Sequence, residues 1–270
     1  MNRGRTDMAA ELIAGLDEEL SEEDGLIVRK RQEGCCELLA VEVTNERGAA
    51  LLGKSIGEYY TLTLPRSLPA LWRDCVLPLT AVIKNLLPPL TGCALVAALG
   101  NPNITPDALG PLTAESILVT HHLKHSSPEF SSFGDVALCR TGVLGTSGIE
   151  SAAQIRSLVS LLRPSFVIAV DALAGREPEG LCKSVQVSSA GIAPGSGVGN
   201  DRERLDRDFL GVPVISVGVP TVADLSPSSA LFVTPRDIDA QVRTTAKLIA
   251  YAIDLALHPA LTVQELETLL

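Results

Sequence analysis

The sequence predicts an α/β fold in three layers, with a mostly parallel mixed sheet and helices on both of its faces. From about residue 70 onward, short continuous apolar runs alternate with longer amphipathic segments. This alternation is typical of strands that are buried on both faces and of helices that cover them. Hydrophobic residues make up 46% of the 270 residues and charged residues 20%, so the chain can form a large core. Aromatic residues are only 3%, so we expect a mostly aliphatic core.

The first 65 residues predict one helix and three short strands. Residues 8–20 carry apolar side chains at helical spacing and indicate an amphipathic helix. Glycines near positions 48 and 53 indicate turns between the strands that follow. Because these strands are short and consecutive, we expect them to pair antiparallel at an edge of the sheet. They are residues 26–30, 37–43 and 59–64.

The remainder of the chain predicts alternating strands and helices. Pro78 must lie in the early part of its helix or kink it. Without an internal repeat or a linker in the sequence, we expect a single folded domain. The predicted strands are residues 93–99, 134–138, 166–170, 184–187 and 213–217. The predicted helices are residues 71–87, 112–121, 151–162 and 237–257, with a final turn or two at 263–270.

Charge and cysteine usage exclude several classes of protein. A net charge of −10 argues against nonspecific nucleic-acid binding, which needs a basic surface. The apolar stretches are too short, or too interrupted by proline, to span a membrane, and the polar start is unlike a signal peptide. The six cysteines show no CxxC spacing, so neither a zinc ribbon nor thioredoxin chemistry is indicated. We expect reduced thiols in a cytoplasmic protein without a membrane or nucleic-acid partner.

Two aspartates follow apolar runs and are the main catalytic candidates. Asp171 comes directly after the strand predicted at 166–170, and Asp107 follows the strand at 93–99 by a short loop. Because ligands bind beyond the carboxyl ends of parallel strands, we expect both carboxylates in one cleft. An ionised carboxylate can deprotonate a water, while a protonated one polarises the scissile carbonyl or protonates the leaving amine. The pair therefore predicts hydrolysis by activated water.

Each aspartate also has a simpler interpretation. Asp107 alone is equally consistent with an N-cap of the next helix, and Asp171 with an ion pair to Arg176 or Arg140. Together the two carboxylates could instead hold a divalent metal with a third ligand. The histidine cluster at 121–125 lacks HExxH spacing and is expected at the opposite end of the sheet, so we interpret it as a solvated helix end.

A glycine-rich segment at 191–200 indicates close approach to a substrate. Its glycines fit neither a P-loop nor a G-x-G-x-x-G motif, so nucleotide binding is not favoured. Glycine lets the backbone come near a bound molecule. No serine lies in the context of a nucleophile elbow, which argues against a serine hydrolase.

Several runs, in the same order along most of the chain, resemble those of the germination protease family, the spore endopeptidases. They are residues 100–111, 142–150, 167–174, 194–200 and 211–221, with Arg5-Thr6-Asp7-Met8-Ala9 near the start and Val233-Thr234-Pro235 near the end. The resemblance implies an α/β fold similar to that of the hydrogenase-maturation peptidases. It also implies cleavage of small acid-soluble spore proteins in the spore core during germination. It implies an atypical aspartic peptidase without a cofactor, with Asp107 and Asp171 as the essential pair, in a homo-oligomer of four chains.

The resemblance also implies a zymogen that processes itself. In the family, processing follows the aspartate of the Arg-Thr-Asp run, which here is the bond between Asp7 and Met8. The expected organisation is a prosegment at 1–7 and a peptidase domain at 8–270, with preference for an acidic residue before an apolar one. Residues expected to shape the substrate cleft are Asn101, Gly145, Gly195, Gly197 and Gly199.

This chain is expected to depart from the family in three places. The expected prosegment of seven residues is shorter than that of the family. The segment between Thr221 and Val233 is short where the family has a long one, and Ala193 stands where the family has a histidine. Two other functions stay open on the same fold. One is a metal-dependent peptidase of the maturation type that uses the two carboxylates as ligands, and the other is a noncatalytic binding protein.

Overall fold

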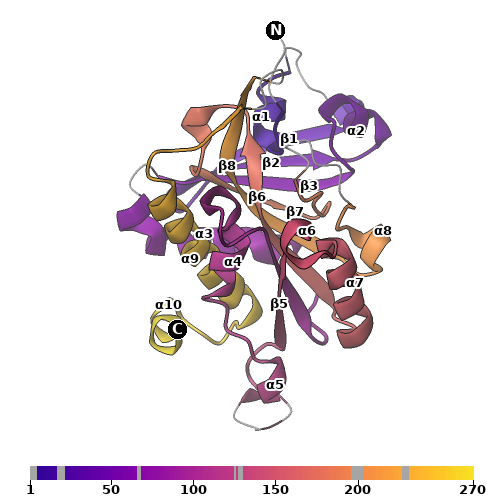
Figure 1. Cartoon of the computed structure of the whole chain (residues 1–270). Coiled ribbons are helices and arrows are strands. Elements are labelled where there is room, and N and C mark those ends of the chain that lie inside the picture. The colour runs from indigo at the N-terminus through magenta and orange to yellow at the C-terminus, as the bar shows by residue number, and fades with distance from the viewer. Residues whose placement is uncertain are drawn as a thin grey trace.

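The fold is α/β and is built on one nine-stranded mixed sheet (Figure 1). The computed structural model describes residues 5–16, 22–65, 68–124, 126, 130–195, 203–226 and 231–270. The strands are β1 (Leu26–Glu33), β2 (Cys36–Val43), β3 (Gly57–Thr63), β4 (Ala94–Leu99), β5 (Val136–Gly142), β6 (Phe166–Gly175), β7 (Ser184–Ser188), β8 (Val214–Ser226) and β9 (Leu231–Val233). Their order is β1-β2-β3-β7-β8-β6-β4-β5, and β9 pairs with β8.

The expectation of a mostly parallel sheet is wrong. The parallel pairings are those of β4 with β5, β4 with β6, and β6 with β8. The pairings of β1 with β2, β2 with β3, β3 with β7, β7 with β8, and β8 with β9 are antiparallel. The antiparallel pairing of the first three strands was expected. The direction of β7 was not, because a short apolar run reads the same in either direction.

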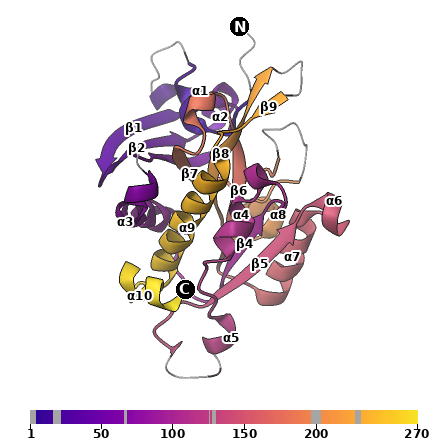
Figure 2. The ribbon, with the colours of Figure 1, turned by 60° about the vertical axis from the view of Figure 1, so that its left-hand side comes forward.

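Helices cover both faces of the sheet, as expected (Figure 2). One face packs on α3 (Leu68–Leu86), α4 (Leu109–Ala114), α9 (Ile238–Leu257) and α10 (Val263–Leu269). The other packs on α7 (Ser151–Leu162) and α8 (Arg207–Leu210). A smaller cluster lies between β1–β3 and the helices α1 (Ala9–Ile13) and α2 (Glu46–Leu52). The remaining short elements are α5 (His121–Lys124), α6 (Leu144–Ser147) and the 3-10 turns η1 (Glu22–Asp24), η2 (Thr105–Asp107) and η4 (Pro178–Gly180).

Helix α2 occupies a segment that the sequence suggested was turns. Asn45 caps it by accepting the N–H of Gly48, and Gly53 ends it in a left-handed conformation. Gly48 packs directly on Gly25, because a Cβ at position 48 would lie 2.2 Å from the Gly25 oxygen. The two glycines that suggested turns are therefore a close contact and a helix end.

Two other helices differ from expectation. The helix expected at 112–121 is instead α4 and α5, separated by the nonhelical residues 115–120. Pro111 fits α4 because it lies in the first turn, where its missing N–H costs nothing. Pro78 lies in the middle of α3, which nevertheless continues through it. Within the described part of the chain, no helix combines the length and apolarity needed to cross a membrane.

Candidate active site

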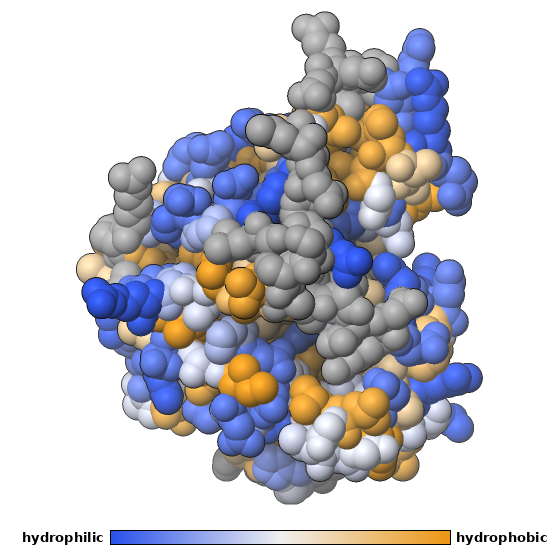
Figure 3. All heavy atoms as spheres, turned by 45° about the horizontal axis from the view of Figure 1, so that its top comes forward, coloured by the Kyte–Doolittle hydropathy of each residue, from blue (hydrophilic) through white to orange (hydrophobic). Residues whose placement is uncertain are grey.

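A cavity of about 530 Å³ opens beyond the end of β4, and it is lined by both candidate aspartates. Asp107 and Asp171 share this cavity with Asp7 from the start of the chain. Its mouth includes apolar side chains that are partly exposed, among them Ile104 and Phe232. Figure 3 shows the face of the molecule at this end of the sheet, where hydrophobic and hydrophilic residues are interspersed. The cavity thus combines carboxylates with an apolar rim.

Asp171 lies inside strand β6 and not in a loop after it. The strand continues to Gly175, and Asp171 pairs in register with Gly218 of β8. The sequence suggested an earlier end because aspartate is depleted in strands. The side chain is 4% exposed, and its Oδ1 accepts the N–H of Ala172 at 2.9 Å. A rigid, buried strand therefore positions this carboxylate.

Asp107 lies in the η2 turn, which is held by a compact loop. Its Oδ2 accepts the backbone N–H of Asn101 at 2.9 Å, and its carbonyl accepts the same N–H at 3.0 Å. Thr221 of β8 donates to the carbonyl of Pro106 at 2.6 Å. Helix α4 starts later, with Ala108 at the N-cap position. Asp107 is therefore not the N-cap of that helix, and its carboxylate binds back toward the end of β4.

Two glycines bring the Asp107 loop against the strands. Gly100 has φ +108°, and a Cβ there would lie 2.0 Å from the backbone carbonyl oxygen of Asp107. Gly110, in the first turn of α4, packs on the ends of β4 and β6, since a Cβ would lie 2.2 Å from the Leu99 oxygen and 2.7 Å from the Val170 oxygen. Only residues without a side chain allow this approach. The loop is thereby held next to Val170, whose neighbour is Asp171.

Asp7 lies against the free edge of β6. Strand β4 pairs with β6 only as far as Val170, so residues beyond it have an open edge. The Asp7 N–H donates to the Ala174 carbonyl at 2.9 Å, and the Ala174 N–H donates to Asp7 Oδ2 at 2.9 Å. One backbone hydrogen bond and one bond to the Asp7 side chain thus hold the start of the chain against the edge of β6.

Two side chains donate to the carbonyl oxygen of Asp7. Lys54 Nζ lies 2.8 Å from this oxygen and Gln186 Nε2 lies 3.0 Å from it. The Gln186 Oε1 in turn accepts the N–H of Ala9 at 2.7 Å, which fixes the orientation of the amide. Burial lowers the pKa of the Lys54 amine, and the nearby Asp7 opposes that shift. Sequence reasoning missed both donors, because no motif connects Lys54 or Gln186 with the first residues.

Met8 follows Asp7 into an apolar pocket. Its side chain is 2% exposed and belongs to the core cluster that includes Leu173 of β6. The N–H of Met8 donates to Thr6 Oγ1 at 3.0 Å. The Asp7–Met8 bond therefore has an acidic side chain bound to the edge of β6 on one side and a buried apolar side chain on the other.

The other predicted cleft residues have different positions. Gly195 lines the cavity, whereas Gly197 and Gly199 lie outside the described residues. Asn101 positions Asp107 through its backbone and is not among the described residues that line the cavity. Gly145 lies in α6 and is likewise absent from the described lining, which here comes from Val143 and Ser151.

Two groups of potential metal ligands lie outside this cavity. Cys93, His121 and Asp135 meet at the other end of β4 and β5, where His121 Nδ1 lies 2.7 Å from Asp135 Oδ1. This agrees with the expected position of His121 at the end of the sheet opposite the candidate aspartates, whereas His125 lies outside the described residues. Cys35, Cys36 and Cys75 form the other group. Burial raises the pKa of Cys35, and a hydrogen bond with Cys36 raises that of Cys75, so neither is a ready nucleophile.

Comparison with known proteins identifies the family. The germination protease family matches residues 5–230. The germination protease of Caldanaerobacter subterraneus subsp. tengcongensis is 36% identical, over 98% of this chain and 98% of its own length. That of Clostridium tetani is 33% identical over 98% of this chain and 99% of its own, and that of Bacillus subtilis 39% identical over 82% and 63%. The first alignment has 323 positions, more than the 270 residues of this chain, so the relative has segments without a counterpart here. The chain belongs to the germination protease family, whose members are endopeptidases of spore germination.

Proposed function

We propose that this chain is a self-processing endopeptidase that cleaves small acid-soluble spore proteins through water activated between Asp107 and Asp171. One observation carries the proposal: Asp7, the residue before the expected processing bond, lines the same cavity as the two aspartates. The cavity would therefore serve both for cleavage of the chain itself and for cleavage of its substrates.

The substrate binds in this proposal as an added strand. An extended peptide would donate a backbone N–H to the Ala174 carbonyl at the edge of β6, as Asp7 does in this structure. Its acidic side chain accepts the Ala174 N–H, and the next residue fills the apolar pocket that holds Met8. This arrangement gives a physical reason for preferring an acidic residue followed by an apolar one.

The proposed chemistry divides between the carboxylates and the two donors. One carboxylate takes a proton from the water, whose oxygen attacks the carbonyl carbon of Asp7, and the other gives a proton to the departing amide nitrogen of Met8. Lys54 and Gln186 donate to the carbonyl oxygen and stabilise the negative charge that develops on it.

Further parts of the proposal come from the family resemblance. They are the prosegment at 1–7 and the domain at 8–270, a likeness of the fold to the hydrogenase-maturation peptidases, and a cytoplasmic location in the spore core. They also include assembly of four chains. Size measurement of the purified full chain would test the last of these.

The direct test is intact-mass analysis of the full chain after mild acid treatment. We expect loss of the seven residues before Met8, and retention of the full mass in Asp171→Asn. An unchanged mass in the unaltered chain would overturn self-processing. Cleavage of a spore protein by the same sample is measured separately, because a chain that does not process itself can still hydrolyse a substrate.

The metal-dependent peptidase predicts a different response to chelation. If the carboxylates act as metal ligands, activity is lost in EDTA and returns with a divalent cation. Activity that persists in EDTA supports the water-activating pair. A noncatalytic binding protein would bind spore proteins without producing any cleavage.

A further inference from the structure

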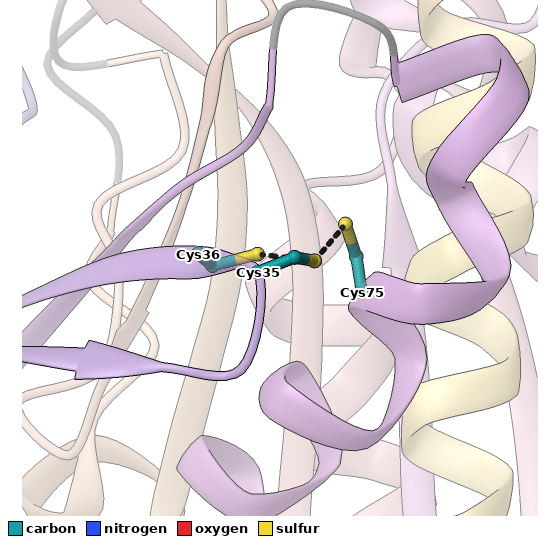
Figure 4. Close-up of side chains that lie close together, drawn as sticks. All are labelled: Cys35, Cys36 and Cys75. Carbon is teal, nitrogen blue, oxygen red and sulfur yellow. Dashed lines mark hydrogen bonds between the residues drawn. The ribbon is translucent and has the colours of Figure 1, made fainter.

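We propose that Cys35, Cys36 and Cys75 bind one thiophilic divalent cation, Zn²⁺ being the physiological choice, at a site separate from the peptidase cavity. Figure 4 shows the three side chains directed toward one another. Cys35 and Cys36 come from the β1–β2 hairpin, and Cys75 from helix α3. Cys35 and Cys75 are 40 positions apart in the sequence, so the fold brings them together.

The spacing of the sulfur atoms suits a single metal ion. Cys35 Sγ lies 3.7 Å from Cys36 Sγ and 3.5 Å from Cys75 Sγ. The three ligand atoms all lie within 4.8 Å of one another. Sulfurs bound to zinc at about 2.3 Å in a tetrahedron lie about 3.8 Å apart. Only small movements of the side chains would therefore complete three corners of such a site.

The two segments that carry the thiols are packed tightly together. Gly34, in the turn before Cys35, has φ +59°, and a Cβ there would lie 2.8 Å from Pro78 Cγ. Pro78 lies three residues after Cys75, so the two project from the same side of α3. Glycine at the hairpin tip thus allows the close approach that brings Cys35 to Cys75. This packing holds together the two segments that carry the thiols.

Exposure and charge also fit a metal ion. Cys36 and Cys75 are buried, whereas Cys35 is exposed and gives an ion a path of entry. Thiolate ligands select soft and borderline ions such as zinc over magnesium or calcium. Three thiolates around a divalent cation leave one negative charge, and the position facing solvent can take a water as the fourth ligand.

A disulfide accounts for less of this arrangement. It needs a sulfur–sulfur distance of about 2.0 Å and would join only two of the three thiols. The remaining thiol would then lie beside the bond without a partner. A metal ion uses all three sulfurs at nearly their present spacing, and it clamps the tip of the hairpin to helix α3.

The test is metal binding by the reduced full chain. We expect one Zn²⁺ per chain in competition with a chromophoric chelator, and Co²⁺ should produce a thiolate-to-metal absorption band. Cys75→Ser and Cys35→Ser should each weaken the affinity at least about 100-fold, since even outer-shell changes cost 10–100-fold. Because Cys35 is exposed, Cys35→Ser should fold normally, so the test remains possible even if Cys75→Ser fails to fold.

The matched control is Cys139→Ser, which removes a half-buried thiol outside the cluster and should leave the affinity unchanged. Binding of Zn²⁺ that is equal in the unaltered chain and in Cys35→Ser would overturn the proposal. So would a fully reduced chain that takes up no Zn²⁺ or Co²⁺. None of these readouts depends on peptidase activity.

Discussion

The candidate active-site cavity and the three-thiol cluster are each assembled from distant segments, yet only the first could be expected from the sequence. Asp107 follows β4, and Asp171 lies in the parallel strand β6 just beyond the last residue that pairs with β4. Because the carboxyl ends of parallel strands meet at one edge of a sheet, the sequence could place both residues there. The thiols come from a hairpin tip and the side of a helix, and no rule of topology brings these two together. Regular topology makes convergence predictable, whereas packing between irregular surfaces does not.

The largest expected effect is on the carboxylates of the cavity. Asp107→Asn and Asp171→Asn should each lower kcat/KM on a spore-protein substrate by about 10³-fold, because general acid–base groups contribute 10²–10⁴-fold. The temperature of thermal unfolding should change little. Full activity in either variant would contradict the proposed mechanism. The cavity would then be no more important for hydrolysis than the thiol cluster.

The two carbonyl donors should have a smaller effect. Lys54→Met should slow self-processing by about 10²-fold, the order of effect of removing one donor to an oxyanion. Gln186→Leu should act in the same direction. Lys30→Met, which changes an exposed lysine on β1, is the control. A Lys54 variant that processes at the normal rate would show that the contact with Asp7 only holds the chain in place.

Asp254 tests whether burial of a carboxylate is enough for catalysis. It is fully buried in α9, accepts the N–H of Leu118, and has a pKa raised well above its ordinary value by burial. The raised pKa stabilises the fold at pH values below the ordinary pKa of aspartate, and this contribution is lost as pH rises through the pKa of the folded state. Asp254→Asn should therefore unfold about 2–4 °C higher near pH 8, the shift given by roughly 1 kcal/mol, and show no such gain near pH 4.

Peptidase activity in Asp254→Asn should stay normal, in contrast to Asp171→Asn. If both variants lost activity while their stability was unchanged, Asp254, which lies outside the cavity, would also be required for hydrolysis. Thermal scans at the two pH values and one kinetic assay decide between these outcomes.

The smallest expected effect on hydrolysis belongs to the thiols. Cys35→Ser should keep kcat/KM within about twofold, because distant sites act independently, while its zinc affinity falls. If kcat/KM fell together with the zinc affinity, the hairpin tip and the cavity would be energetically coupled. Parallel measurement of both properties on one sample makes the separation quantitative.

Particular residues show how far sequence reasoning reached in the fold. The alternating runs predicted most strands and the long helices, because each element must place aliphatic side chains in the core at the spacing of its own geometry. The direction of β7 was missed, since the pairing of Gln186 with Gly218 depends on the chain returning from Arg176 to Lys183. Helix α2 was missed because Gly48 and Gly53 are read as turn residues until their neighbours are known.

The sequence by itself determined the family, and it predicted the two aspartates and the bond expected to be processed, because these depend on residue types in a fixed order. Only the tertiary structure decided that Asp7 lies at the edge of β6, that Lys54 and Gln186 donate to its carbonyl, and that three thiols meet. The physical reason is that such contacts depend on where β4 ends and on how closely Gly34 lets the hairpin approach α3. Those distances are properties of packing, and no spacing along the chain encodes them.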